Sequence, residues 1–324
     1  MTGPLLETIS LSKQFIVGSR FSARGQLRVQ AVDNVSLAIN PGETLGLVGE
    51  SGCGKSTLGR CMVRLYSINS GSLRFQGEDI TAHSMRAMRP IRRELQMVFQ
   101  DPYASLNPRR RVRDLIAEPM RVHGKTPAAD IARRVAELLD LVGLRPDHAA
   151  RFPHEFSGGQ RQRIGIARAI ALEPKLIVLD EPVSALDVSV QAQIVNLLAD
   201  LQERLKLTYV FIAHDLSVVR QVSTRIAVMY LGSIVELGQA EDIFSKPAHP
   251  YTGALISAVP IPDVSKSGSR NRIVLTGDVP SPVNPPSGCR FHPRCPVAQD
   301  RCRSERPALA PLASGRVVAC HFPL

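Results

Sequence analysis

A glycine-rich stretch, residues 49–57, restricts this chain more than any other feature of its sequence. It fits the pattern G-x-x-x-x-G-K-[S/T], a loop that cradles phosphate groups. A short apolar run of strand length, residues 44–48, precedes it, and residues 56–65 can form a helix because they contain no proline. Glycines let backbone N–H groups turn inward around a phosphate, and the helix start adds partial positive charge. We therefore expect a bound nucleotide to contact all nine residues of the loop: Gly49, Glu50, Ser51, Gly52, Cys53, Gly54, Lys55, Ser56 and Thr57.

Two residues of this loop have specific expected roles. Lys55 can reach the β- and γ-phosphates, and Ser56 can ligate magnesium. The alternative is a glycine-rich turn that binds nothing, and the order of strand, loop, Lys-Ser pair and helix disfavours it. The pattern predicts a nucleotide but leaves open how its energy is used.

Length, composition and charge set outer limits on the fold and the partners. The 324 residues allow two or three compact units, and 44% hydrophobic residues are ample for a core. No run approaches the ~18 apolar residues needed to span a bilayer, and residues 1–15 lack a secretory signal, so we expect a cytoplasmic protein. The net charge of +11 suits nucleic acid, an anionic membrane or an acidic partner. With only 5% aromatic residues, a base-stacking platform is not indicated.

Predicted strands and helices alternate along residues 5–245, which indicates an α/β fold with a mainly parallel sheet. The expected strands are residues 5–15, 34–39, 44–48, 72–75, 95–99, 176–179, 209–213, 226–230 and 234–237. The expected helices are residues 56–65, 84–94, 113–122, 128–142, 161–172 and 189–205, and residues 17–30 are predicted to be a loop. The helices within about residues 101–172 form an insertion between two strands. Proline becomes frequent from residue 246, so we place a domain boundary there, between residues 1–245 and 246–324.

Polar residues follow three of these strands. Asp180 would help to hold magnesium, and Glu181 would act as general base toward the attacking water. Gln100 can contact both magnesium and the water, and His214 can hydrogen-bond the γ-phosphate and orient the water. Each alone is as well explained by an ordinary turn or surface residue. The phosphate loop earlier in the chain favours their roles in phosphoryl transfer.

A second glycine-rich helix start has the physics of an anion site. It consists of Ser157, Gly158, Gly159 and Gln160. Since one nucleotide does not need two phosphate sites from one chain, we expect a head-to-tail dimer in which each nucleotide lies between two chains. Asp187 would then contact the partner chain. The alternative is a plain helix cap with an N-terminal serine.

Four of the six cysteines lie close to the C-terminus: Cys289, Cys295, Cys302 and Cys320. Cytosolic chains rarely keep disulfides, so the cluster indicates a metal site more than bridges. Four thiolates suit zinc or an iron–sulfur cluster. The spacing lacks the C-x2-C knuckle frequent in zinc sites and favours iron–sulfur, with zinc and free thiols as alternatives.

The motifs, in their order along the chain, resemble the ATP-binding cassette family over about residues 5–245. The sequence FSGGQ at residues 156–160 is highly specific to that family. The resemblance implies ATP and Mg²⁺ as ligands, with Phe15 stacked on the adenine. It also implies a phosphate-loop core with an N-terminal antiparallel β subdomain and an inserted helical subdomain.

Four further motifs resemble the ATPase subunits of dipeptide/oligopeptide importers, in particular the second ("F-type") ATPase of the peptide permeases. They are FQDPYASLNP at residues 99–108, PHEF at 153–156, HPYT at 249–252 and PSP at 280–282. The resemblance implies a peripheral position on the cytoplasmic face of the bacterial inner membrane, against an anionic leaflet. Its implied partners are a paralogous second ATPase, two transmembrane permease subunits and an extracytoplasmic peptide-binding protein. It also implies a [4Fe–4S] cluster on the four tail cysteines.

Two other functions remain open at this point. Related importers carry nickel or glutathione. The sequence of this ATPase chain does not encode which solute is transported. A soluble cassette ATPase acting on nucleic acid or ribosomes would explain the basic charge. Such proteins usually carry two cassettes in one chain, and this chain has one, so we expect no nucleic-acid partner.

Overall fold

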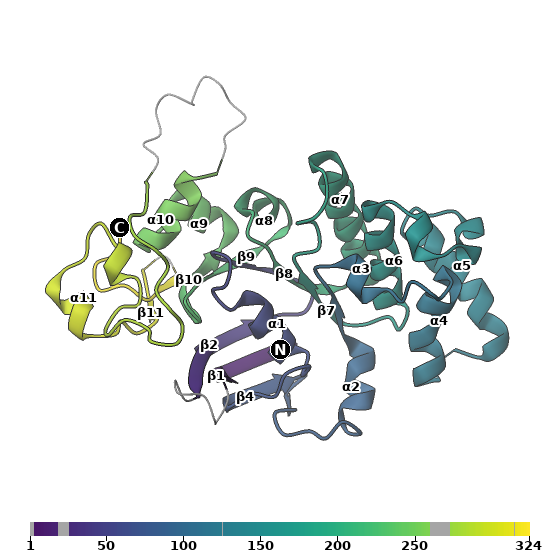
Figure 1. Ribbon diagram of the computed structural model, residues 1–324, viewed down its shortest axis with the longest axis horizontal. Helices are drawn as coiled ribbons and strands as arrows, with labels where there is room; N and C mark the ends of the chain where they lie inside the picture. The colour runs from purple at the N-terminus through teal and green to yellow at the C-terminus, as the bar shows by residue number, and fades with distance from the viewer. Residues whose placement is uncertain (1–2, 19–25, 125, 260–272, 314) are drawn as a thin grey trace. The chain divides into compact units, whose positions relative to one another are not determined.

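The computed structural model describes residues 3–18, 26–124, 126–259, 273–313 and 315–324 (Figure 1). The chain folds into two compact units, each assembled from separate stretches of sequence. The first unit comprises Met1–Leu5, Asn40–Thr44 and Ala82–Ile212. The second comprises Leu6–Ile39, Leu45–Thr81 and Ala213–Leu324.

Three parallel strands form the sheet of the first unit, in the order β6 (Leu95–Val98), β7 (Leu176–Asp180) and β8 (Thr208–Ile212). Every residue of β7 and β8 is buried. Continuous apolar runs are typical of strands covered on both faces, so these two strands form the core of the unit.

Helices make up most of the rest of the first unit. They are α2 (Met88–Glu94), α3 (Pro102–Ser105), α4 (Val112–His123), η1 (Ala128–Asp130), α5 (Ile131–Leu141), η2 (Pro146–Ala150), η3 (Pro153–Glu155), α6 (Gly158–Ile170) and α7 (Val188–Leu205). Figure 1 shows α4, α5 and α6 gathered together, as expected for the helical insertion. α4 continues through Pro119, and Gly124, in a left-handed conformation, caps its C-terminal end.

The second unit contains two groups of strands. The antiparallel group has the order β2 (Leu27–Ile39), β1 (Leu6–Val17), β4 (Ser70–Phe75) and β5 (Glu78–Asp79). In the other, β3 (Thr44–Val48) pairs in parallel with β9 (Arg225–Tyr230). β9 is followed outward by antiparallel β10 (Ser233–Gln239), β12 (Val317–Val318) and β11 (Ala310–Pro311).

The helices of the second unit are mostly short. They are α1 (Lys55–Met62), α8 (Leu216–Val222), α9 (Ala240–Ser245), α10 (Pro250–Ser257), η5 (His292–Arg294) and α11 (Asp300–Ser304). Among the residues that the structure describes, no helix combines the length and the apolar character needed to cross a bilayer.

The predicted fold class is confirmed, with parallel core strands, an N-terminal antiparallel sheet and inserted helices. One local expectation was wrong. β2 begins at Leu27, so the predicted loop over residues 17–30 is shorter, and its residues 19–25 lie outside the described part. The tail after residue 246 contributes β11 and β12, which extend the sheet beyond β10. Residues 260–272 of the proline-rich tail segment also lie outside the described part.

Candidate nucleotide site

The phosphate loop of the second unit has a backbone that only glycine can adopt at two positions. Gly49 has a φ of 151° and Gly54 a φ of 105°. A Cβ atom on Gly49 would lie 2.1 Å from the Met229 carbonyl oxygen, and one on Gly54 would lie 2.0 Å from the Ala31 carbonyl oxygen. Both contacts are with backbone, which cannot move aside. The loop therefore packs between two neighbouring segments as a preformed turn.

The Lys55 side chain binds the backbone of this turn. It is buried, and Nζ donates hydrogen bonds to the carbonyl oxygens of Gly49 at 2.8 Å and Glu50 at 3.0 Å. α1 begins at Lys55, so Ser56 and Thr57 lie in its first turn, where backbone N–H groups point toward the N-terminal end of the helix. The ammonium group and these N–H groups are hydrogen-bond donors of the kind that bind a polyphosphate.

Cys53 in the same loop acts as a small packing residue. It is buried, and burial raises the pKa of its thiol, with Lys55 acting in the opposite direction. Its carbonyl oxygen accepts a hydrogen bond from Gly232 N–H at 2.8 Å. The loop is thus tied to the turn between β9 and β10.

Phe15, the predicted adenine-stacking ring, lies in β1 of the second unit and is half-buried. It packs edge-to-face on Tyr66 with ring centroids 5.4 Å apart, and Lys13 Nζ lies 5.0 Å from its centroid. A neighbouring ammonium group gives this aromatic site a positive charge. Its stacking role stays a prediction.

The structure brings two predicted catalytic residues together in the first unit. Gln100, just after β6, donates a hydrogen bond from Nε2 to Glu181 Oε2 at 2.8 Å. Asp180 ends the adjacent strand β7 and is completely buried. The carboxyl ends of neighbouring parallel strands therefore place an amide and two carboxylates at one edge of the sheet.

Glu181 has an unusual backbone. Its φ is 47°, in the left-handed region that non-glycine residues rarely occupy. Its N–H donates to the Ile212 carbonyl at 2.9 Å, and its own carbonyl accepts from the Ser184 hydroxyl at 3.1 Å. Strained conformations of this kind persist where the surrounding structure holds them, often at functional sites.

The helix start at residues 157–160 forms a reciprocal cap. Ser157 Oγ accepts from Gln160 N–H at 3.3 Å, and Gln160 Oε1 accepts from Ser157 N–H at 3.0 Å. A Cβ atom on Gly159 would lie 2.4 Å from Val190 Cγ1, so this glycine permits α6 to pack on α7. The plain helix cap that the sequence allowed is present, and an anion role is compatible with it. Asp187 precedes α7 and is exposed.

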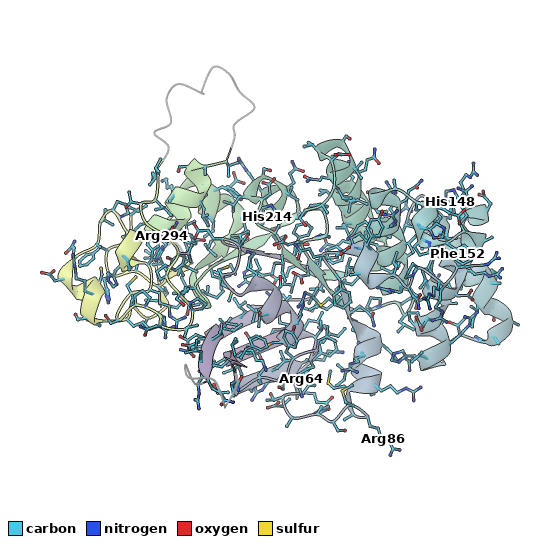
Figure 2. The ribbon with its side chains drawn as sticks, viewed as in Figure 1. Arg64, Arg86, His148, Phe152, His214 and Arg294 are labelled. Atoms are coloured by element: carbon cyan, nitrogen blue, oxygen red, sulfur yellow. The ribbon has the colours of Figure 1, made fainter. Side chains whose placement is uncertain are left out.

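The predicted site residues are divided between the two units. The phosphate loop, Phe15 and His214 belong to the second unit, whereas Gln100, Asp180, Glu181, residues 157–160 and Asp187 belong to the first. His214, labelled in Figure 2, follows Ala213 in the chain. The Ala213 N–H donates to the Leu47 carbonyl at 3.2 Å.

The four tail cysteines line one small cavity together with His249, His292 and His321. All four have free thiols. Burial raises the pKa of the Cys320 thiol to about 11 and raises the pKa values of Cys289 and Cys295. Among the described residues, however, no three His, Cys, Asp or Glu side chains are placed to hold a metal ion. Four thiols are the right kind of ligand for zinc or an iron–sulfur cluster. In the structure, however, their side chains are not placed to hold a metal ion.

Two of the histidines at this cavity have other partners. One ring nitrogen of His292 lies 2.9 Å from the Cys289 carbonyl oxygen, and one of His321 lies 2.9 Å from the Glu305 carbonyl oxygen. Each of these two rings therefore contacts a backbone carbonyl of the tail.

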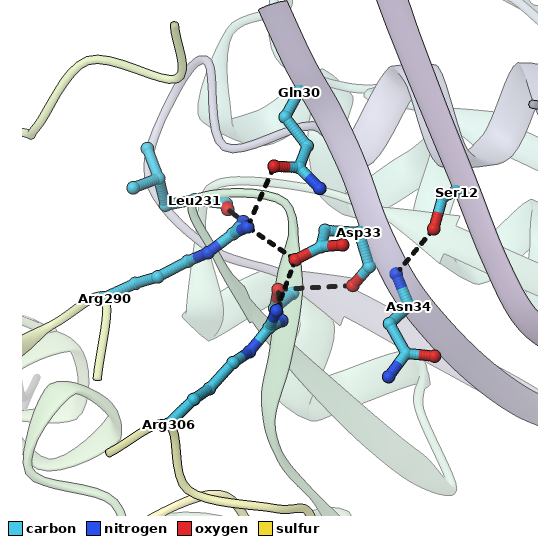
Figure 3. Close-up of polar contacts among 8 residues, drawn as sticks. Ser12, Gln30, Asp33, Asn34, Leu231, Arg290 and Arg306 are labelled. Carbon is cyan, nitrogen blue, oxygen red and sulfur yellow. Dashed lines mark hydrogen bonds and ion pairs between the residues drawn. The ribbon is translucent and has the colours of Figure 1, made fainter. Parts of the chain in front are cut away.

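Tail residues that the sequence analysis did not single out attach the tail to the rest of the second unit. Arg290 and Arg306 both donate to Asp33 Oδ2, at 2.5 Å and 2.6 Å, and Arg290 also contacts Gln30 and the Leu231 carbonyl (Figure 3). Arg294 forms a two-pronged ion pair with Glu50 of the phosphate loop. No local pattern signals these pairs, because their members are far apart in sequence.

Comparisons with known proteins agree with this arrangement. Residues 32–184 match the family described as ABC transporter, and residues 235–302 match the oligopeptide/dipeptide transporter C-terminal region. The chain is 54% identical to the putative oligopeptide transport ATP-binding protein YkfD of Bacillus subtilis, over 98% of this chain and 95% of the relative. It is 50% identical to the oligopeptide transport ATP-binding protein OppF of Salmonella typhimurium, over 94% of this chain and 92% of the relative.

Solved structures show the same core. The ATP-binding cassette MJ0796, in a dimeric post-hydrolysis state bound to ADP and Pi, matches with a TM-score of 0.65 and 28% identity, covering 72% of this chain and 98% of that one. The transporter component cbiO1 of Clostridium perfringens matches with a TM-score of 0.65 and 27% identity, covering 75% and 91%. The chain is therefore an ATPase of the ABC transporter family and belongs with the oligopeptide and dipeptide transport ATP-binding proteins.

Proposed function

We propose that this chain hydrolyses ATP to power the import of dipeptides or oligopeptides into a bacterial cell. The observation that carries the proposal is its identity of about half to peptide-transport ATP-binding proteins along nearly the whole chain. The match of residues 235–302 to the oligopeptide/dipeptide transporter C-terminal region favours peptides over nickel or glutathione.

Each unit supplies part of the ATPase chemistry. In the second unit, the N–H groups of residues 49–57 and the Lys55 ammonium bind the phosphates, Phe15 stacks on adenine, and His214 hydrogen-bonds the γ-phosphate. Ser56 and Asp180 supply oxygen ligands of the kind that magnesium prefers. Bound magnesium neutralises the charge that develops on the phosphates.

Glu181 is the general base of this reaction. Its carboxylate takes a proton from the attacking water as the bond between the β- and γ-phosphates breaks. Gln100 positions that carboxylate through the 2.8 Å hydrogen bond from its Nε2. Its other side-chain atom, Oε1, is then the one available to magnesium.

The second glycine-rich helix start serves a partner ATPase. Ser157, Gly158, Gly159 and Gln160 would contact the γ-phosphate bound by the other chain, and the start of α6 adds favourable partial charge. Asp187, exposed before α7, would contact the same partner. The partner is a paralogous ATPase, and the closed dimer is the state that hydrolyses ATP.

The remaining partners follow from the same assignment. Two transmembrane permease subunits carry the peptide, and an extracytoplasmic binding protein delivers it. The chain sits peripherally on the cytoplasmic face of the inner membrane, and its net charge of +11 suits an anionic leaflet. In this account residues 1–245 act as the cassette and residues 246–324 as the importer-specific extension, a division supported by the two family matches.

The extension would hold a thiolate-bound group on Cys289, Cys295, Cys302 and Cys320, either a [4Fe–4S] cluster or zinc. All four cysteines line one cavity, which favours this assignment, whereas the placement of their side chains in the described residues does not. Protein purified without oxygen should contain about four iron and four sulfide per chain if the cluster is correct. Zinc without sulfide would establish the alternative, and protein with neither would refute both.

The ATPase assignment is tested with Glu181→Gln. A glutamine keeps the shape of the side chain but cannot accept the proton, so we expect ATP binding to persist and hydrolysis to fall between about a hundredfold and ten-thousandfold. Glu203→Gln, an exposed change on α7, is the matched control and should leave turnover unaltered. Normal turnover by Glu181→Gln would refute the base assignment. Steeply salt-dependent RNA binding without ATP-dependent peptide transport would favour the nucleic-acid alternative.

A further inference from the structure

Glu50, the second residue of the phosphate loop, is held at three points. Its side chain accepts two hydrogen bonds from Arg294, with Nη1–Oε2 at 2.7 Å and Nη2–Oε1 at 3.0 Å. Its N–H donates to the Tyr251 hydroxyl at 2.8 Å, and its carbonyl accepts from Lys55 Nζ at 3.0 Å. Two of these three contacts come from the tail, 201 and 244 residues further along the chain.

Packing fixes the tail residues that make these contacts. Arg294 closes η5, and its side chain is only 8% exposed. Phe291, which precedes that turn, packs on Tyr230 and Tyr251 with ring centroids 5.2 Å and 5.4 Å away. All three rings are fully buried, so the guanidinium group and the Tyr251 hydroxyl are presented to the loop from a rigid aromatic cluster.

The charge of Glu50 makes this pairing matter for nucleotide binding. A carboxylate in a loop built for a polyanion repels the phosphates unless a cation neutralises it. The two-pronged geometry is the strongest form of arginine–carboxylate contact, and it holds both carboxylate oxygens toward the tail. Donating hydrogen bonds to the Glu50 carboxylate raises the pKa of Arg294, so the guanidinium stays charged.

We propose that Arg294 is a positioning residue for ATP binding: it neutralises Glu50 and, with Tyr251, holds the phosphate loop in its binding conformation. The cysteine-bearing tail is then part of the nucleotide site's support. Arg294 directly precedes Cys295, and the Cys289 N–H donates to the Cys302 carbonyl at 2.8 Å, so Arg294 lies within the cysteine region. Because it takes residues 49–57 as the ATP site, this role of Arg294 rests on the proposed function.

A double-mutant cycle on the full-length protein tests this role. Arg294→Gln leaves a partly buried carboxylate without its cation, and we expect the dissociation constant for Mg-ATP to rise about tenfold, within the ordinary range for coupled sites. The KM for ATP should rise by a similar factor and kcat should change less, since the catalytic base is untouched. Adding Glu50→Gln removes the repelling charge, so the double variant should bind ATP within about twofold of Glu50→Gln alone.

Three controls separate the possible outcomes. Arg301→Gln removes an exposed tail arginine that pairs with Glu305, and it should leave ATP affinity unchanged. Arg294→Lys keeps the charge but loses the fork, and it should recover part of the affinity. Thermal unfolding of each variant shows whether a loss of affinity is only a loss of fold.

The outcomes distinguish this role from the proposed function. If wild-type protein binds no ATP, or Lys55→Ala binds as wild type does, the ATPase assignment itself fails. If wild type binds ATP and Arg294→Gln binds equally well, the positioning role is wrong. A double variant that is as weak as Arg294→Gln would also contradict it, because the loss would then not arise from the charge of Glu50.

Discussion

Three glycines of the phosphate loop differ in how strictly the structure requires them. Gly49, Gly52 and Gly54 all have positive φ angles, of 151°, 77° and 105°. A Cβ atom would strike backbone oxygen at Gly49 and Gly54 but would meet nothing within 4 Å at Gly52. The G-x-x-x-x-G-K-[S/T] motif specifies only Gly49 and Gly54. These are the two positions at which a Cβ atom would strike the backbone.

This difference predicts unequal effects of adding one methyl group. Gly52→Ala should cost only the backbone strain of about 1 kcal/mol, with ATP affinity close to that of wild type. Gly49→Ala adds a clash with the Met229 carbonyl and should cost about 3 kcal/mol or more while abolishing ATP binding. Urea unfolding and ATP titration of both variants measure this. Equal behaviour of the two variants would contradict the loop geometry.

The sequence predicted candidate catalytic residues but not their conformations. Glu181 was expected from its place after an apolar run, but no pattern indicates its left-handed φ of 47°. That angle depends on hydrogen bonds to Ile212 and Ser184, one of which comes from the neighbouring strand. Gln100 is predicted from the sequence to contact water and magnesium. Its hydrogen bond to Glu181 cannot be predicted in that way, because it depends on the register of β6 against β7.

Helices show which elements could be predicted from sequence. Residues 128–142 have apolar side chains at helical spacing, and α5 with η1 occupies almost that span. α10 was not predicted, because it begins at a proline within a segment whose proline content indicated a boundary. Its buried Tyr251 packs on Tyr230 of β9, and such tertiary contacts leave no local periodicity.

The cap of α6 gives a prediction at the scale of one element. Ser157 Oγ accepts from the N–H three residues on at 3.3 Å, and Ser84 Oγ accepts from Ala87 N–H at the same distance. Replacing either serine by alanine should cost about 1 kcal/mol or less of stability. Only Ser157→Ala should also lower ATPase activity of the assembled transporter, by tenfold or more in rough terms, if it contacts the partner's nucleotide.

Stability and transporter ATPase measurements on both serine variants decide this point. Similar unfolding midpoints with activity lost in Ser157→Ala alone would support the composite site. Equal activity in the two variants would reduce residues 157–160 to a structural cap.

At the scale of the whole chain, the contacts between distant segments were beyond sequence reasoning. Asp33 pairs with Arg290 and Arg306 across separations of 257 and 273 residues, and Glu50 pairs with Arg294 across 244. The sequence indicates a separate extension because proline becomes frequent from residue 246. In the structure it adds strands beyond β10 and contacts the phosphate loop.

The Asp33 contacts predict that the tail contributes to the stability of the second unit. Asp33→Asn leaves Arg290, whose side chain is 10% exposed, without its counter-charge. Breaking a buried pair in this way should lower the free energy of unfolding by about 3–5 kcal/mol. Glu305→Gln breaks an exposed pair with Arg301 and should leave the urea midpoint unchanged. Identical midpoints for the two variants would show that the Asp33 cluster is not stabilising.

Peptide uptake by living cells tests the central claim most directly. In the organism that carries this chain, the chromosomal copy is replaced by Glu181→Gln, and uptake of a labelled tripeptide is compared with uptake of the same amino acid in free form. We predict that tripeptide uptake falls to background while free amino-acid uptake is unaffected, and that Glu203→Gln cells match wild type. Undiminished tripeptide uptake in Glu181→Gln cells, with no other peptide importer active, would contradict the assignment of this ATPase to peptide import.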